Sequence, residues 1–231
     1  MSRRVIFFDI DGTLLASGGA GQLAMQGALV EEFRVQFPFE GVLTAGRTDF
    51  GIVTEIFDRY GIEHTETQRR RFRQAYLERL PGCLQSLSGL ILPGVADLLA
   101  RLSRQDDLVL ALLTGNYSEG AWIKLQHFEL DHYFEFGGFG DGHADRNRVA
   151  DAARQAAESV LGGAIAGRQC CVVGDTPADI ECARAIGASV VAVATGTYNI
   201  DELSAHNPDH LFADFSSVDE VTESITTFNS M

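Results

Sequence analysis

Short apolar runs without helical spacing recur along the chain, and they predict strands that are buried on both faces of a sheet. They cover residues 5–8, 108–113, 169–173 and 189–194, with an edge strand at 210–212 and a further short strand at 133–136. Between the later runs, apolar residues return every three or four positions, which predicts helices. This alternation through residues 89–231 predicts an α/β fold with a right-handed, doubly wound parallel sheet.

Residues 18–88 interrupt this alternation with helical patterns and no convincing strand. Three apolar series mark the helices: Met25, Leu29 and Phe33; Val53, Ile56, Phe57 and Tyr60; Phe72, Tyr76 and Leu80. Thr48 precedes the second series as an N-cap, and Gly61 ends it. We therefore expect two domains, an α/β core formed by residues 1–17 and 89–231 and an inserted α-helical domain formed by residues 18–88.

Polar side chains follow four of the predicted strands at the point where each strand ends. They are Asp9 with Asp11, Thr114 with Asn116, Asp175 with Asp179, and Thr195. Because open parallel sheets place their ligands at the carboxyl ends of the strands, we expect these side chains to meet at one edge. An ordinary turn would explain Gly12 well but Asp9 poorly.

The sequence DIDGTL at residues 9–14, directly after an apolar strand, resembles the first motif of the haloacid dehalogenase superfamily. Most members of that family hydrolyse phosphate esters through an aspartyl-phosphate. The residues at 114–116 and 175–179 resemble its second and fourth motifs. The likeness covers the chain apart from the variable insertion, which in this family forms a helical cap, and the pattern is similar to phosphoglycolate phosphatases and their relatives.

The resemblance implies a role for each matching residue. Asp9 would be the nucleophile that attacks phosphorus. Asp11 would be the general acid that protonates the leaving oxygen and later acts as a base toward water. Thr114 and the amide of Gly115, with Asn116 beside them, would bind phosphoryl oxygens. The substrate would be a small phosphorylated metabolite.

Negative charge gathers in such a reaction beside an anionic nucleophile, so a cation is needed. Mg²⁺ fits this need because it prefers oxygen ligands and keeps several of its waters. The resemblance implies ligation by Asp9, the backbone carbonyl of Asp11, and Asp175, with Asp179 in support. Asp179 lies three residues after Thr176, so a role in capping the next helix is compatible with it.

The third motif of the family is where this chain departs from the pattern, because the usual Lys-Pro pair before the fourth motif is missing. Arg146 occupies the corresponding place in the sequence. Lys124, the only lysine in the chain, lies one helix earlier and is a rival. Both are candidate phosphate-binding cations.

The polar loop at residues 46–49 precedes a predicted helix within the insertion. Arg47 and Thr48 are candidate substrate-specificity residues here, since the amides at a helix start attract anions. An ordinary capped turn explains the same residues equally well.

Composition limits the partners of the protein. Its 231 residues carry a formal net charge of −14, which disfavours duplex nucleic acid and anionic membranes. The four cysteines, Cys83, Cys170, Cys171 and Cys182, lack metal-ligand spacing and suggest reduced thiols. With neither a signal peptide nor a membrane-spanning run, we expect a cytoplasmic monomer or homodimer.

Other functions share parts of this pattern. A 2-haloacid dehalogenase also uses an aspartate nucleophile, but by the family resemblance it lacks a counterpart of Asp11 and needs no metal. A phosphomutase would differ mainly in its cap and stays an alternative. A non-catalytic phosphoacceptor or binding module would be shorter and would lack an insertion like residues 18–88. Hydrolysis of a phosphomonoester is therefore the favoured function.

Overall fold

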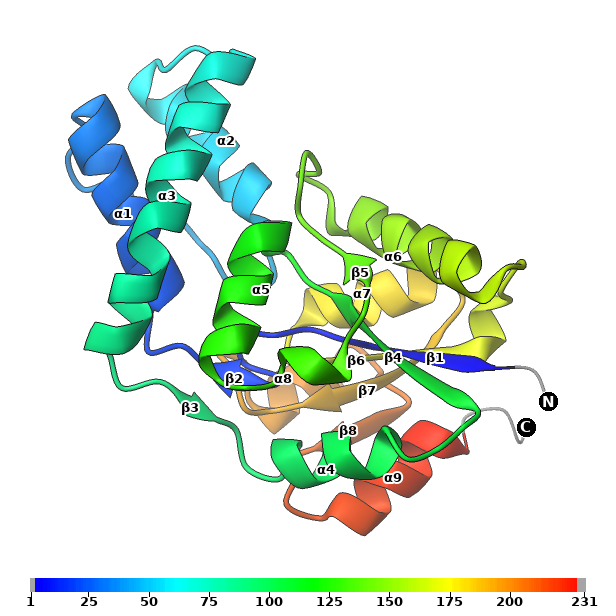
Figure 1. Ribbon diagram of the computed structural model, residues 1–231. Coiled ribbons are helices and arrows are strands. Elements are labelled where there is room, and N and C mark those ends of the chain that lie inside the picture. The colour runs from blue at the N-terminus through cyan, green and yellow to red at the C-terminus, as the bar shows by residue number, and fades with distance from the viewer. Residues whose placement is uncertain (1–2, 228–231) are drawn as a thin grey trace.

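The computed structural model describes residues 3–227 and has a six-stranded parallel sheet at its centre (Figure 1). Its strands are β1 (Arg4–Phe8), β4 (Leu108–Leu113), β5 (Gly137–Gly138), β6 (Cys170–Gly174), β7 (Ser189–Val193) and β8 (His210–Phe212). Their order across the sheet is β5-β4-β1-β6-β7-β8, so the first strand of the chain lies in the interior of the sheet. The predicted α/β fold class is confirmed.

Helices cover both faces of this sheet (Figure 1). They are α4 (Val95–Leu102), α5 (Ser118–His127), α6 (Arg146–Leu161), α7 (Pro177–Ala185), α8 (Ile200–Ser204) and α9 (Val218–Thr226). Ile6 and Phe8 of β1 pack in the core that α4, α5 and α9 cover. Val5 and Phe7 pack in the core that α6 and α7 cover. Successive side chains of a strand point to opposite faces, which is why a strand covered on both faces is apolar throughout.

The inserted helices α1 (Ala20–Phe33), α2 (Asp49–Tyr60) and α3 (Glu66–Ser86) supply most of a third apolar core, which also includes Tyr117, the residue before α5. We call residues 18–88 the cap. An antiparallel pair of two-residue strands, β2 (Leu15–Ala16) and β3 (Leu90–Ile91), joins the chain where it enters and leaves the cap. The division of the chain into two domains, residues 1–17 with 89–231 and residues 18–88, stays a prediction.

Local signals placed both ends of α2 correctly. Thr48 caps α2 by accepting a hydrogen bond from the amide of Gly51, and Gly61 ends this helix with a left-handed φ of 64°. The strand predicted at 133–136 is wrong, since the edge strand β5 comes later, at Gly137–Gly138. Its place is decided by packing, because a side chain at Gly138 would overlap the backbone oxygen of Val149 on α6.

Two findings concern the environment of the protein. All four cysteines are unpaired, and three of them are buried in the sheet and its helices. Within residues 3–227, no helix has the length and apolar character that crossing a membrane requires.

Candidate active site

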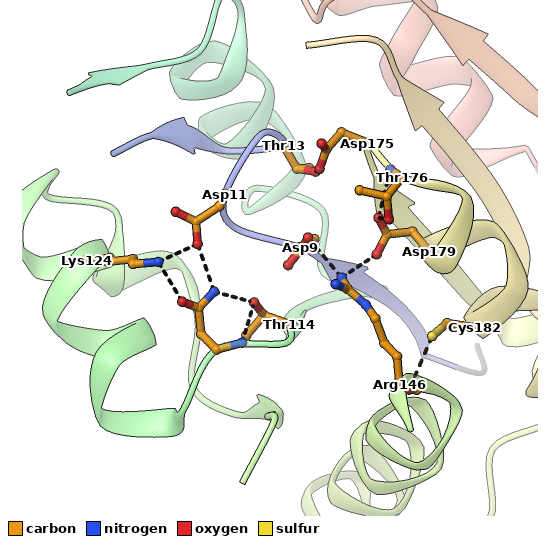
Figure 2. A network of polar contacts seen from close by, with 11 residues as sticks. Asp9, Asp11, Thr13, Thr114, Lys124, Arg146, Asp175, Thr176, Asp179 and Cys182 are labelled. Carbon is orange, nitrogen blue, oxygen red and sulfur yellow. Dashed lines mark hydrogen bonds and ion pairs between the residues drawn. The ribbon is translucent and has the colours of Figure 1, made fainter. Parts of the chain in front are cut away.

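Polar side chains from neighbouring strands meet at the carboxyl edge of the sheet (Figure 2). Asp9 directly follows β1, Thr114 follows β4 and Asp175 follows β6. These three residues lie side by side because β1 pairs in parallel with both β4 and β6. They line a cavity of about 340 Å³ between the core and the cap, a size that suits a small ligand.

Three buried carboxylates form the acidic part of this edge. One oxygen from each of Asp9, Asp175 and Asp179 lies within 4.8 Å of the others. Burial and the charges of Asp179 and Asp9 raise the pKa of Asp175 well above its ordinary value. Burial likewise raises the pKa of Asp179 to about 6. Three carboxylates lie close together here, and Arg146 supplies one positive charge among them. Such a set of oxygen atoms suits a hard divalent cation such as Mg²⁺.

Asp175 is positioned by groups from the turn after β1. The hydroxyl of Thr13 donates a hydrogen bond of 2.9 Å to Asp175 Oδ1. A side chain at either Gly12 or Gly196 would overlap Asp175 Oδ2, so both glycines make room for this carboxylate. Gly12 also has a φ of 84°, which a residue with a side chain rarely adopts. The turn therefore holds Asp175 at the wall of the cavity.

Asp179 lies behind the other two carboxylates and does not line the cavity. Its Oδ2 accepts hydrogen bonds from the backbone amide and the hydroxyl of Thr176, at 3.0 and 2.7 Å. Its Oδ1 accepts a hydrogen bond of 2.5 Å from Arg146. Because both oxygens are held by the protein, this geometry suits the supporting role and the capping role together.

Arg146 reaches the acidic cluster from the first turn of α6 (Figure 2). Its Nη2 lies 2.9 Å from Asp9 Oδ2 and 2.5 Å from Asp179 Oδ1, and the side chain is only 8% exposed. Burial disfavours its charge, but the two carboxylates outweigh burial and raise the pKa of Arg146. The structure thus brings Arg146 to the candidate nucleophile.

Asp11 points away from Asp9, toward α5 (Figure 2). Lys124 Nζ lies 2.5 Å from Asp11 Oδ2 and 2.6 Å from Asn116 Oδ1, and the amide of Asn116 donates to the same Asp11 oxygen. Ser17 donates to the other oxygen at 3.1 Å. Burial opposes ionisation of Asp11, yet Lys124 and these hydrogen bonds hold its pKa below the ordinary value. The two candidate cations therefore serve different carboxylates.

The segment after β4 supplies the expected phosphate-binding groups. Thr114 Oγ1 accepts hydrogen bonds from the side-chain amide and the backbone amide of Asn116, so its own hydrogen is left to donate to a ligand. A side chain at Gly115 would overlap the backbone oxygen of Arg47, and the carbonyl of Gly115 accepts from the amide of Asp49. Gly115 thus permits the cap to approach the core closely.

The two cap residues expected at the substrate occupy different places. Arg47 lines the cavity, but its guanidinium pairs with Glu55 at 2.5 Å. Thr48 is fully buried and does not line the cavity, since its hydroxyl caps α2 and donates to the carbonyl of His143 at 2.6 Å. The geometry favours the capped-turn interpretation for Thr48, whereas Arg47 still reaches the cavity.

Three further cavity residues were not expected from the sequence. Ser17 lies in the glycine-rich link, Asp49 is the first residue of α2, and Tyr76 is on the buried face of α3. Asp49 accepts a hydrogen bond from the amide of Tyr117, and burial raises its pKa to about 7. An acidic residue at a helix start and an aromatic residue at helical spacing both have ordinary structural explanations, so no local signal distinguished them.

Comparisons with known proteins agree with this geometry. A family model described as haloacid dehalogenase-like hydrolase matches residues 3–187. A phosphoglycolate phosphatase from Synechococcus elongatus is 30% identical over 215 residues, which cover 90% of this chain and 92% of that protein.

Solved structures share the fold. A hydrolase from Pseudomonas syringae has a TM-score of 0.71 at 22% identity, with 96% of this chain and 99% of that one covered. CbbY from Rhodobacter sphaeroides, solved in complex with phosphate, has a TM-score of 0.69 at 18% identity, with coverages of 94% and 96%. At these identities the two structures establish the likeness of the fold alone.

Proposed function

Because this chain belongs to the haloacid dehalogenase-like hydrolase family, we propose that it is a magnesium-dependent phosphatase that cleaves a small phosphomonoester through an aspartyl-phosphate on Asp9. The proposal depends on the position of Asp9. Its carboxylate directly follows an interior strand, lies among the oxygens of the acidic cluster, and is paired with Arg146 at 2.9 Å. A nucleophile so placed has a compensating positive charge beside it at the wall of the cavity.

In the first step a carboxylate oxygen of Asp9 would attack phosphorus, and the bond from phosphorus to the leaving oxygen would break. Asp11 would give a proton to that oxygen, so that the alcohol leaves as a neutral molecule. In the second step Asp11 would take a proton from a water molecule that attacks the phosphoenzyme. Inorganic phosphate is then released, and the carboxylate of Asp9 is restored.

The contacts of Asp11 favour one of its two roles. Its ion pair with Lys124 favours the ionised form, which is the form that acts as a base in the second step. The first step needs the protonated form. A bound phosphate ester would compete with Asp11 for the ammonium of Lys124, and this competition would allow Asp11 to hold its proton.

The phosphoryl group would be bound by groups at the end of β4 and at the start of α6. The hydroxyl of Thr114 and the amide of Gly115 would donate to its oxygens, with Asn116 holding Thr114 in place. Arg146 would balance the charge that gathers beside Asp9. These donors come from the segment after β4 and from the first residue of α6, so the fold must form before the site exists.

The residues at this edge fit Mg²⁺. The donor atoms are all oxygens, and burial together with the charges of Asp179 and Asp9 raises the pKa of Asp175, so a bound cation would stabilise its ionised form. Asp9 and Asp175 would hold the ion with the carbonyl of Asp11, and Asp179 would support them. When bound, Mg²⁺ would offset the charge of the phosphoryl group and of the nucleophile.

Features of the site distinguish this proposal from its alternatives. Asp11 and Asp175 favour phosphoryl transfer over dehalogenation, which by the family resemblance needs neither a second aspartate nor a metal. The small cavity suits a phosphorylated metabolite as substrate. We place the enzyme in the cytoplasm, where its four unpaired cysteines would stay reduced.

The test is a panel of phosphorylated metabolites assayed for phosphate release with Mg²⁺ present. We expect turnover of at least one ester, and we expect Asp9→Asn to lower it by about a thousandfold or more, because the nucleophile is lost. Asp106→Asn, the same change at an exposed position, is the matched control. Full activity in Asp9→Asn, or turnover of a haloacid but of no ester, would contradict the proposal.

A further inference from the structure

The hydroxyl of Tyr76 is a buried polar group for which the cap provides no partner. Tyr76 is fully buried, and among residues 3–227 no group forms a hydrogen bond with its Oη. The residue nevertheless lines the cavity that contains Asp9. Its ring stacks on Phe72 at 6.2 Å, so the position of the hydroxyl is fixed by packing. Buried hydroxyls nearly always have a partner, so this one points to a group on a ligand.

The hydroxyl of Tyr76 packs closely against a glycine of α5. A side chain at Gly120 would come within 2.8 Å of Tyr76 Oη. Gly21 of α1 has the same relation to Lys124, because a side chain there would lie 3.2 Å from Lys124 Nζ. Glycines on α5 and α1 therefore let the polar ends of Tyr76 and Lys124 approach these helices closely.

Asp49 contributes a carboxylate to the same cavity. Its Oδ2 accepts a hydrogen bond of 2.8 Å from the amide of Tyr117, and the residue is only 8% exposed. No ion pair to Asp49 exists in the described part of the chain. This carboxylate can accept a hydrogen bond from a ligand, and it would repel a ligand carboxylate.

The cations that line the cavity are already paired. Lys124 lies against Asp11, Arg47 against Glu55, and Arg146 against Asp9. Arg146 belongs to the end of the cavity where the phosphoryl group would bind. At the cap end, Tyr76 and Asp49 offer a hydroxyl and a carboxylate beside the polar side chains of Gln22 and Thr44, and the described residues offer no unpaired cation there.

We propose that Tyr76 and Asp49 form a hydroxyl-binding subsite, so that the preferred substrate is the phosphate ester of a small neutral polyol or sugar and not that of a hydroxy acid. One hydroxyl of the leaving group donates a hydrogen bond to the carboxylate of Asp49. A second hydroxyl forms a hydrogen bond with Tyr76 Oη. The inference rests on the proposed phosphatase function and names the substrate class for it. The volume of about 340 Å³ limits the ester to a few carbons beyond the phosphate.

The test compares kcat/KM for glycerol 3-phosphate and erythritol 4-phosphate with kcat/KM for 2-phosphoglycolate, under one Mg²⁺ concentration. We expect the wild type to prefer a polyol ester by about tenfold or more, because a buried hydrogen-bonding group selects against ligands that leave it unpaired. Tyr76→Phe should lower this preference by about tenfold, chiefly through KM for the polyol ester. Asp49→Asn should also lower the preference for polyol esters. It should do so by lowering KM for 2-phosphoglycolate, since the repelling charge is removed.

Tyr133→Phe removes a hydroxyl outside the cavity and should leave the preference unchanged. Tyr76→Phe should also keep the melting temperature of the wild type, because its hydroxyl bonds to no described protein group. If Tyr76→Phe lowered the melting temperature and lowered kcat/KM for all esters equally, Tyr76 would have a structural role and the inference would be overturned. Asp49→Asn decides the outcome if Tyr76→Phe does not fold.

Binding separates this inference from the proposed function. Isothermal titration of Asp9→Asn with the same three esters measures their dissociation constants without turnover. Tighter binding of a polyol ester, with no hydrolysis of any ester by the wild type, would refute the phosphatase and keep the subsite. Preference of the wild type for 2-phosphoglycolate, or an unchanged preference in Tyr76→Phe, would refute the subsite and keep the phosphatase.

Discussion

Arg146 and Lys124 are both buried cations, but each is paired with a different carboxylate. Arg146 lies against Asp9, whose side chain is 7% exposed. Lys124 lies against Asp11, whose side chain is 38% exposed. If Lys124 is removed, water can therefore partly solvate the carboxylate of Asp11. If Arg146 is removed, water has much less access to the carboxylate of Asp9. Loss of one partner from a buried pair commonly costs about 3–5 kcal/mol, and the cost falls as the remaining charge gains access to solvent.

We expect Arg146→Ala to lower kcat about a hundredfold more than Lys124→Ala does, because it removes the charge beside the nucleophile. It should lower the free energy of unfolding by about 3–5 kcal/mol, and Lys124→Ala by about 1–2 kcal/mol. Steady-state kinetics and urea unfolding measure the two effects. Arg154→Ala, which breaks a surface pair with Glu158, is the control and should change stability by less than about 1 kcal/mol. A larger loss of kcat in Lys124→Ala would instead make Lys124 the phosphate-binding cation.

Helix α2 is the element that joins the cap to the active-site loops. Three hydrogen bonds hold its N-terminus. The hydroxyl of Thr48 donates to the carbonyl of His143, and the amide of Asp49 donates to the carbonyl of Gly115. The carboxylate of Asp49 accepts from the amide of Tyr117. Helix α3 begins with a similar cap, in which the hydroxyl of Thr65 accepts a hydrogen bond from the amide of Gln68, the third residue of α3. Thr65, however, is exposed. Thr48 thus caps α2 and also bonds it to the carbonyl of His143, whereas Thr65 only caps α3.

Thr48→Ala and Thr65→Ala should each cost about 1 kcal/mol for the lost cap. Thr48→Ala should cost about 1 kcal/mol more, because the carbonyl of His143 loses its donor. It should also raise KM, since α2 carries Asp49 into the cavity, whereas Thr65→Ala should not. Chemical denaturation and kinetics of the pair measure both effects. Equal losses of stability and equal KM values would show that the contact with His143 does not hold the cap.

The protein carries a formal net charge of −14 and also buries a cluster of carboxylates, and both features lower the stability of the metal-free chain. The pKa of Asp179 is raised to about 6 in the folded protein, and that of Asp175 is raised well above its ordinary value. Between pH 4 and pH 6 the folded chain therefore holds protons that the unfolded chain has released. Since the folded state binds more protons there, stability falls as the pH rises through this range.

Mg²⁺ should reverse this loss, because it binds the ionised carboxylates in place of protons. At a concentration a hundredfold above its dissociation constant it should add about 2.7 kcal/mol, which raises the melting temperature by about 5–10 °C at pH 8. The shift should be much smaller at pH 5, where protons compete. Thermal unfolding with and without Mg²⁺ at both pH values measures it, and Asp175→Asn should abolish the shift. An equal shift at the two pH values would place the ion at another site.

Patterns within short stretches of sequence were enough for the α/β fold class, the helical insertion and the residues that follow β1, β4 and β6. These features follow from local chemistry, because a strand covered on both faces must be apolar throughout and its end is marked by the first polar residue. The caps at Thr48 and Thr176 were predictable for the same reason, since capping joins residues three apart.

Other features depend on contacts between distant parts of the chain. The edge strand β5 formed at two glycines, where Leu112 of β4 leaves no room for a side chain at Gly137 and α6 leaves none at Gly138. In the sequence, position favoured Arg146 and left Lys124 as a rival, and only the packing of α5 and α6 assigned them to different carboxylates. Asp49 and Tyr76 look like a helix start and a core aromatic until the cap folds over the sheet. The direction of a side chain is decided by the elements packed around it, and spacing along the chain carries no record of those contacts.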